Sequence, residues 1–245
     1  MLAAGARDSA THLRKKHLTG VMRLLTGLLL ATLISAPAFA QKSASARITA
    51  ATEDLKEMMN ASDKGIPQDL LNRASCLVII PNLKAGGFVV GAQYGKGFFT
   101  CRKESGVGWH APGSIKLTGG KFGFLIGGKE TDVIMLVMNK EGMNHLLSDK
   151  FQIGGEASAA AGPLGRDSSA MTDAEMHAEI LSYSRSRGIF GGIDIGGSAV
   201  TADEDANEEL YGKRLSNREI FDDSVHTPDD ARPLIHELDL LSSRK

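Results

Sequence analysis

Apolar residues recur at helical spacing near the start of the chain. Within the segment Ser43–Ala61, the intervals between Ile48, Leu55 and Met58 place all three on one side of a helix. Ile66-Pro67 then has the form of a second helix start, since proline is favoured in the first turn. The pattern therefore predicts two helices ahead of the rest of the fold.

The middle of the chain alternates short Val-, Ile- and Phe-rich runs with glycines. Most of the 28 glycines lie between residues 86 and 197, a pattern typical of short, twisted antiparallel strands. No predicted strand alternates with a long amphipathic helix, which argues against a parallel doubly wound sheet. We expect strands over 76–80, 87–93, 97–102, 114–117, 122–127, 131–138, 151–161, 180–186 and 188–195, with a helical turn over 141–147.

The last segment, residues 198–245, is acidic and predicts helix and loop. Together these patterns predict an α+β fold. We expect a curled antiparallel β-sheet or partial barrel, with N-terminal helices and a C-terminal helical segment.

The first 40 residues have the form of a signal peptide. Basic residues up to Arg23 precede the apolar run Leu24–Ile34, and small residues at Ala38 and Ala40 mark a cleavage site before Gln41. The apolar run is too short to span a bilayer, which takes about 20 residues. We therefore expect residues 1–40 to be removed and residues 41–245 to form one exported, periplasmic or secreted domain. Translation from Met22 would also give a complete signal.

Charge and aromatic content narrow the classes of partner. The full chain has a net charge of −1, and the leader holds five basic residues and one acidic residue, so the mature chain carries −5. That balance excludes the basic character of a nucleic-acid binder, and 5% aromatic residues exclude an extended base-stacking surface. Attraction to an anionic membrane would have to come from a local patch.

Catalytic and metal-binding motifs are absent from the sequence. Gly123–Lys129 has the spacing of a phosphate-binding loop, but Glu130 follows where Ser or Thr should hold magnesium, and we expect a β-hairpin there. The histidines lack the spacing of metal ligands. We therefore expect no enzyme activity, no metal and no cofactor.

The two cysteines leave two alternatives. An exported protein with Cys76 and Cys101 invites a disulfide bond. In a simple meander, however, Cys76 begins the first strand and Cys101 ends the third, so the residues would lie at opposite ends of the sheet. A disulfide needs Cα atoms within about 7 Å, and we therefore expect two free thiols.

Several short blocks between Ala74 and Gly212 form a recognisable series. The blocks are Leu77-Val-Ile-Ile-Pro-Asn82, Lys84-Ala-Gly86, Val90-Gly-Ala-Gln-Tyr-Gly-Lys-Gly97, Trp109-His-Ala-Pro112, Ile115-Lys-Leu-Thr-Gly-Gly120, Asp149-Lys-Phe151, Ala160-Ala-Gly-Pro163, Gly165-Arg-Asp167 and Ile180-Leu-Ser-Tyr-Ser-Arg-Ser-Arg-Gly188. In this order they resemble the SYLF domain, a lipid-binding family also described as a fungal-type actin-binding domain. The resemblance implies a non-enzymatic domain that binds phospholipid, phosphoinositides in eukaryotic members.

Candidate lipid-binding residues come from this series. Tyr183, Arg185 and Arg187 share one strand face by their spacing, and arginine suits a phosphate because its planar fork donates two hydrogen bonds. The alternative is a solvated face or structural ion pairs with Asp167 or Asp173.

A second candidate is the turn expected at Gly119-Gly120. There Lys116 and Lys121 would flank backbone N–H groups that bind an anion, although an ordinary charged hairpin is the alternative. Arg166, in one of the SYLF-like blocks, completes the candidate set.

The sequence therefore predicts an exported, non-enzymatic protein that binds anionic phospholipid in the manner of a phosphoinositide-binding domain. The expected partner is anionic phospholipid or a membrane surface, with no nucleic acid. Actin is not expected as a partner in that compartment. The alternative is a structural or interaction protein of the cell envelope, to which actin binding would come only through the resemblance.

Overall fold

A computed structural model of the 245-residue chain describes residues 43–61, 65–87, 90–122, 127–165, 171–186 and 188–242. At positions 90, 121, 122, 127 and 128 it describes the backbone alone. The expected signal peptide and its cleavage site lie outside these residues, and the division of the chain at residue 40 stays a prediction.

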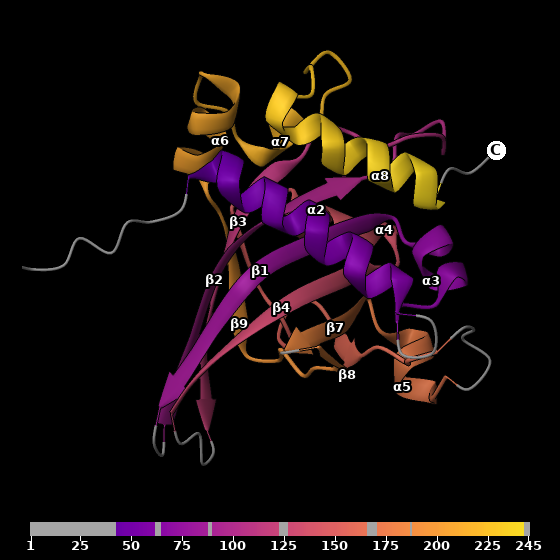
Figure 1. The fold of residues 1–245 in the computed structure, drawn as a ribbon, viewed down its shortest axis with the longest axis vertical. Helices are drawn as coiled ribbons and strands as arrows, with labels where there is room; N and C mark the ends of the chain where they lie inside the picture. The colour runs from indigo at the N-terminus through magenta and orange to yellow at the C-terminus, as the bar shows by residue number, and fades with distance from the viewer. Residues whose placement is uncertain are drawn as a thin grey trace, which may run out of the picture. The chain divides into compact units, whose positions relative to one another are not determined.

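One sheet forms the centre of the described residues. Its order is β5-β9-β3-β2-β1-β4-β7-β6, and β8 also pairs with β7 (Figure 1). All pairs are antiparallel except β6 with β7. The strands are β1 (Cys76–Gly87), β2 (Val90–Cys101), β3 (Gly113–Phe122), β4 (Gly127–Val137), β5 (Lys150–Gln152), β6 (Ala159–Ala161), β7 (Ile180–Ser186), β8 (Ile189–Gly192) and β9 (Ser198–Ala202). The curled sheet is confirmed, with one parallel pair in it.

Helices cover one face of this sheet, and Leu146 of a further helix packs in the core on the other face, which completes the α+β fold. In Figure 1, α2 crosses in front of the strands and α8 lies beside it. The helices are α2 (Ala44–Asn60), α3 (Gln68–Arg73), α4 (Lys140–Leu146), α5 (Asp173–His177), α6 (Glu204–Tyr211), α7 (Asn217–Ile220), the 3-10 turn η1 (Asp229–Ala231) and α8 (Arg232–Ser242). The predicted N-terminal helices, C-terminal helical segment and helical turn near residue 141 are confirmed.

Side chains alternate between the two faces of the sheet along each strand, and each face carries a buried apolar core. In β1, Leu77 and Ile79 face the helices, in a core that includes the predicted apolar stripe of α2. Cys76, Val78 and Ile80 belong to a second core, with residues of β3, β4, β5 and β9. The continuous apolar run of β1 follows from this double burial.

The predicted end of the first strand at Pro81 is wrong. β1 continues to Gly87, and its register against β4 shifts between Ile80 and Leu83. This bulge absorbs Pro81, which has no N–H to donate to a ladder. Asn82 takes a positive φ of 53°, a region that asparagine tolerates better than most residues. The bulge also leaves the Asn82 N–H free of the ladder, and this N–H donates to Oδ1 of Asp132 at 3.0 Å.

The expectation of free thiols is also wrong. The two strands predicted over 87–93 and 97–102 are one strand, β2, which runs antiparallel to β1 and places Cys101 opposite Cys76. The two Cα atoms lie 3.9 Å apart and the sulfurs form a disulfide bond. The sequence argument failed because it inserted a turn at Tyr94–Lys96, where the strand is continuous.

Two further turn predictions fail for the same reason. Gly119 and Gly120 lie inside β3, where Gly119 pairs with Gln93 on β2 and with Ser198 on β9, so they do not form a turn that binds an anion. β3 and β4 are not a hairpin, because β2 and β1 lie between them in the sheet. The segment 198–202, predicted as helix and loop, is the strand β9.

Candidate functional site

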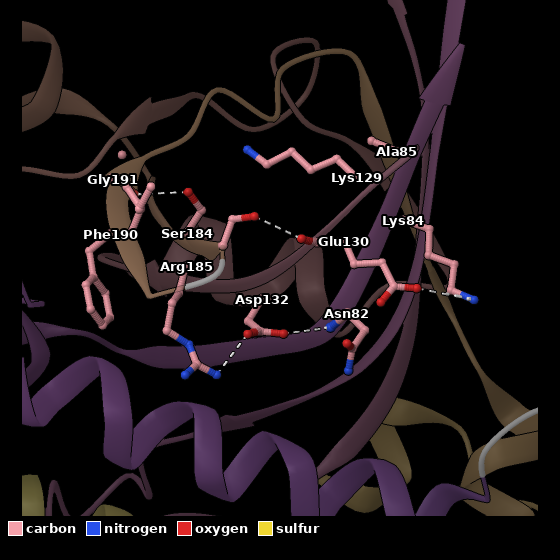
Figure 2. Close-up of a pocket in the computed structure, with 13 residues that line it drawn as sticks. Asn82, Lys84, Ala85, Lys129, Glu130, Asp132, Ser184, Arg185, Phe190 and Gly191 are labelled. Atoms are coloured by element: carbon pink, nitrogen blue, oxygen red, sulfur yellow. Dashed lines mark hydrogen bonds and ion pairs between the residues drawn. The ribbon is translucent and has the colours of Figure 1, made fainter. Parts of the chain in front are cut away.

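An open groove of about 1100 Å³ lies where β7 turns into β8 and diverges from the far half of β4. Figure 2 shows its walls, with β1 and β4 on one side and the β7–β8 hairpin on the other. Ladder pairing between β4 and β7 starts only at Asp132 opposite Arg185, which leaves the groove beyond that pair. Its lining residues are Asn82, Lys84, Ala85, Lys129, Glu130, Asp132, Ser184, Arg185, Ser186, Ile189, Phe190, Gly191 and Gly192.

Arg185 lies at the base of the groove and is held by carboxylates from two elements. Its Nη2 donates to Oδ1 of Asp54 on α2 at 2.7 Å and to Oδ2 of Asp132 on β4 at 2.9 Å. Glu57, one turn further along α2, also pairs with this guanidinium. Asp132 is itself fixed by the N–H of Asn82, which donates to Oδ1 at 3.0 Å. Arg185 therefore links helix α2 to the sheet.

One guanidinium does not neutralise the three carboxylates around it. Asp54 is 5% exposed, and its Oδ2 has no hydrogen-bond partner among the described residues. Burial, followed by the negative charge of Asp132, raises the pKa of Asp54 to about 7, against the opposing effect of Arg185. Asp54 thus keeps its proton to a higher pH than an ordinary aspartate does.

Two lysines on the opposite wall are less constrained. Lys84 makes a long ion pair of 3.8 Å with Glu130, and both side chains are mostly exposed. Lys129 is exposed and has no ion pair among the described residues. Figure 2 shows its side chain extending from β4 out over the groove. The ammonium groups of Lys84 and Lys129 are therefore available to an anion in a way that Arg185 is not.

The remaining lining residues shape the groove. Ser184 Oγ donates to the carbonyl of Gly191 at 3.2 Å and closes the β7–β8 hairpin. Ser186 Oγ donates to the carbonyl of Glu130 at 3.1 Å and joins the two walls. Ile189 is 76% exposed at the rim. An exposed isoleucine beside cationic side chains provides an apolar contact next to a charged one.

The residues predicted from the sequence do not converge on one site. Tyr183 is fully buried in the core beneath α2. Lys116 pairs with the buried carboxylate of Asp203 at 3.0 Å, and three strands separate its strand from β7. Neither reaches the groove, and we leave both out of the proposed site.

Three other predicted residues cannot be placed in the groove. Arg166 and Arg187 lie outside the described residues, as does the side chain of Lys121. Among the predicted residues whose side chains the structure describes, only Arg185 lines the groove. Its guanidinium is paired there with the carboxylates of Asp54, Glu57 and Asp132.

Sequence reasoning missed Asp54, Lys84 and Lys129. Asp54 carried a signal, because it lies three residues after Ala51 and four before Met58, on the apolar stripe of its helix. An acidic residue on a buried stripe calls for a partner. No signal in the sequence marked the two lysines, since their position depends on how far β1 and β4 extend beyond the bulge.

Within the described ranges, no group of three or more His, Cys, Asp or Glu residues is arranged to hold a metal ion. Nor is any helix there long and apolar enough to cross a bilayer.

Comparisons with known proteins place this fold in a family. Residues 118–241 match the family model "Ysc84: Las17-binding protein actin regulator". "Protein YSC84" of Saccharomyces cerevisiae is 33% identical over 181 residues, which are 73% of this chain and 38% of that protein. "LAS seventeen-binding protein 3" of the same species is 32% identical over 73% of this chain and 39% of its own length.

An animal protein shows the same likeness. "SH3 domain-containing YSC84-like protein 1" of Homo sapiens is 28% identical over 76% of this chain and 54% of its own length. The chain thus spans about two-fifths to about half of the length of these relatives, and their names do not describe enzymes. The family match covers half of the chain and agrees with the SYLF-like blocks, so the chain belongs to the Ysc84/SYLF family.

Proposed function

We propose that this protein binds anionic phospholipid without catalysing a reaction, and that the headgroup phosphate enters the groove between β4 and the β7–β8 hairpin. The observation that carries the proposal is the pair of exposed ammonium groups, Lys84 and Lys129, on one wall of a groove whose rim presents Ile189. A charged group beside an apolar one matches the boundary between headgroup and acyl chain.

The charge balance makes this a local site. The mature chain would carry a net charge of −5, which opposes long-range attraction to an anionic surface. Three cationic and two acidic side chains line the groove, and the arginine is already shared among carboxylates. Lysine ammonium groups therefore supply the phosphate contacts, each worth roughly 1.5–3 kcal/mol when well formed and less when exposed.

Export of the protein is part of the same proposal. The Cys76–Cys101 bond supports it, since disulfides persist in oxidising compartments such as the periplasm. The family model and the yeast relatives are named for actin regulation and Las17 binding. If the chain is exported, those partners lie in another compartment, and the expectation that actin is not a partner depends on this proposal.

Vesicle flotation tests the site. We expect the purified protein to float with vesicles containing phosphatidylglycerol and not with phosphatidylcholine alone. Lys84→Gln with Lys129→Gln should weaken binding to the anionic vesicles about tenfold or more. The matched control, Lys140→Gln with Lys213→Gln, removes the same charge from two exposed lysines outside the groove and should bind like wild type.

Two results would contradict the proposal. If the wild-type protein does not float with vesicles of either composition, the proposal that it binds lipid is wrong. If the groove variant and the control variant lose the same amount of vesicle binding, the overall charge of the protein determines binding and this groove does not.

A further inference from the structure

The carboxylate cluster at the base of the groove has a consequence for the proposed ligand. Asp54, Glu57 and Asp132 surround the guanidinium of Arg185, so the cluster carries two negative charges in excess when all three acids are ionised. Arg185 and Asp132 also line the groove, and Figure 2 shows both above the ribbon of α2. An anion that enters the groove therefore meets an excess of negative charge at its base.

Asp54 is the member of this cluster suited to change its charge. Its Oδ1 accepts from Arg185, while its Oδ2 is buried and has no hydrogen-bond partner among the described residues. A buried carboxylate oxygen without a donor is a favourable place for a proton. Glu57, in contrast, is more than half exposed and keeps its hydration.

The charged groups around Asp54 come from three elements. Arg185 on β7 favours its ionised form, whereas Asp132 on β4 and Glu53 on α2 oppose it. Glu57 adds a further carboxylate on the same guanidinium. Loss of its proton near pH 7 fits this excess of acids over bases.

We propose that the groove takes up its anionic ligand together with a proton, which Asp54 binds. This inference depends on the proposed function and names the regulation of that same site. Protonation of Asp54 removes one of the two excess negative charges below the ligand. By linkage, a bound anion favours the protonated form of Asp54, and acidification from pH 8 to pH 6 tightens anion binding. The linkage concerns the charge of the headgroup phosphate, so the probe is a vesicle that contains phosphatidylglycerol.

Binding to phosphatidylglycerol vesicles at pH 6 and pH 8 tests the proposal. We expect wild-type affinity to be about threefold to tenfold higher at pH 6. Asp54→Asn removes the charge permanently, so this variant should bind at both pH values as wild type does at pH 6. Glu141→Gln removes the same charge from an exposed residue of α4 outside the groove and should keep the wild-type dependence on pH.

The outcomes separate this proposal from the function on which it depends. Wild-type binding without dependence on pH, or an Asp54→Asn variant that keeps the wild-type dependence, overturns the proton linkage and leaves lipid binding standing. Absence of vesicle binding at both pH values overturns both.

A second measurement needs no variant. Calorimetric titration of the protein with phosphatidylglycerol vesicles at pH 7, in two buffers of different ionisation enthalpy, gives the number of protons taken up. A fraction of a proton per site supports the proposal, and zero uptake overturns it.

Discussion

Asp54 connects the sequence of a helix to the chemistry of the groove. It lies on the apolar stripe of α2, and burial would make it costly without Arg185, whose guanidinium reaches it from β7. Arg185 is positioned in turn by Asp132, and Asp132 by the Asn82 N–H that the Pro81 bulge exposes. A single proline in β1 thus contributes to the placement of a charge on another strand.

The raised pKa of Asp54 predicts how stability depends on pH. A group whose pKa is higher in the folded protein than in the unfolded chain stabilises the fold at low pH, and that contribution is lost as pH rises. Between the ordinary value of 3.8 and about 7, Asp54 therefore costs wild type stability as the pH increases. Relative to wild type, Asp54→Asn should gain of the order of 2 kcal/mol in unfolding free energy between pH 5 and pH 8.

Urea denaturation at the two pH values measures this difference. Glu141→Gln, at an exposed position of α4 outside the cluster, serves as the control and should show no such gain. A constant difference between Asp54→Asn and wild type at both pH values would rule out a raised pKa at Asp54.

The disulfide acts at the scale of two strands. Cys76 and Cys101 close the end of the β1–β2 pair and belong to the second core, together with Val78 and Ile80. Both residues are fully buried, so the bond stabilises the fold and is not exposed to reductants. Removing a disulfide of this loop length typically costs about 2–4 kcal/mol.

Thiol titration of the unreduced, denatured protein should therefore find no free thiol. Cys76→Ala with Cys101→Ala should lower the free energy of unfolding by about 2–4 kcal/mol, as measured by urea denaturation. Two titratable thiols per chain, or a double variant as stable as wild type, would contradict the β1–β2 register at this end.

The elements show where sequence reasoning succeeds and where it fails. Periodicity located α2, because its buried positions recur at helical spacing. The strand β7 was predicted with its observed bounds of Ile180–Ser186, although its first four residues are all buried and do not alternate. It failed for β1 and β2, where Pro81 and the glycines around Tyr94 have the composition of turns. Pairing with strands on both sides overrides these local preferences, and no local pattern reveals that pairing.

At the scale of the whole molecule, the family and the fold class could be predicted, whereas the site could not. The SYLF-like blocks identified the family because they depend on residue identity alone. The candidate lysine Lys116 was misplaced because its salt bridge with Asp203 joins residues 87 positions apart. Arg185, singled out from the sequence as a phosphate ligand, is held by carboxylates at the base of the groove, and its partners Asp54 and Asp132 come from distant segments that only the folded chain brings together.

The measurement that tests the central claim most directly locates the lipid on the protein. Short-chain phosphatidylglycerol, kept below its micelle concentration, would be titrated into the ¹⁵N-labelled protein while backbone amide resonances are recorded. We predict that the largest shifts fall on Lys84, Ala85, Lys129, Glu130 and the β7–β8 hairpin, and that Lys84→Gln with Lys129→Gln suppresses them. Saturable shifts centred on another part of the molecule, or no saturable shifts at all, would contradict the account.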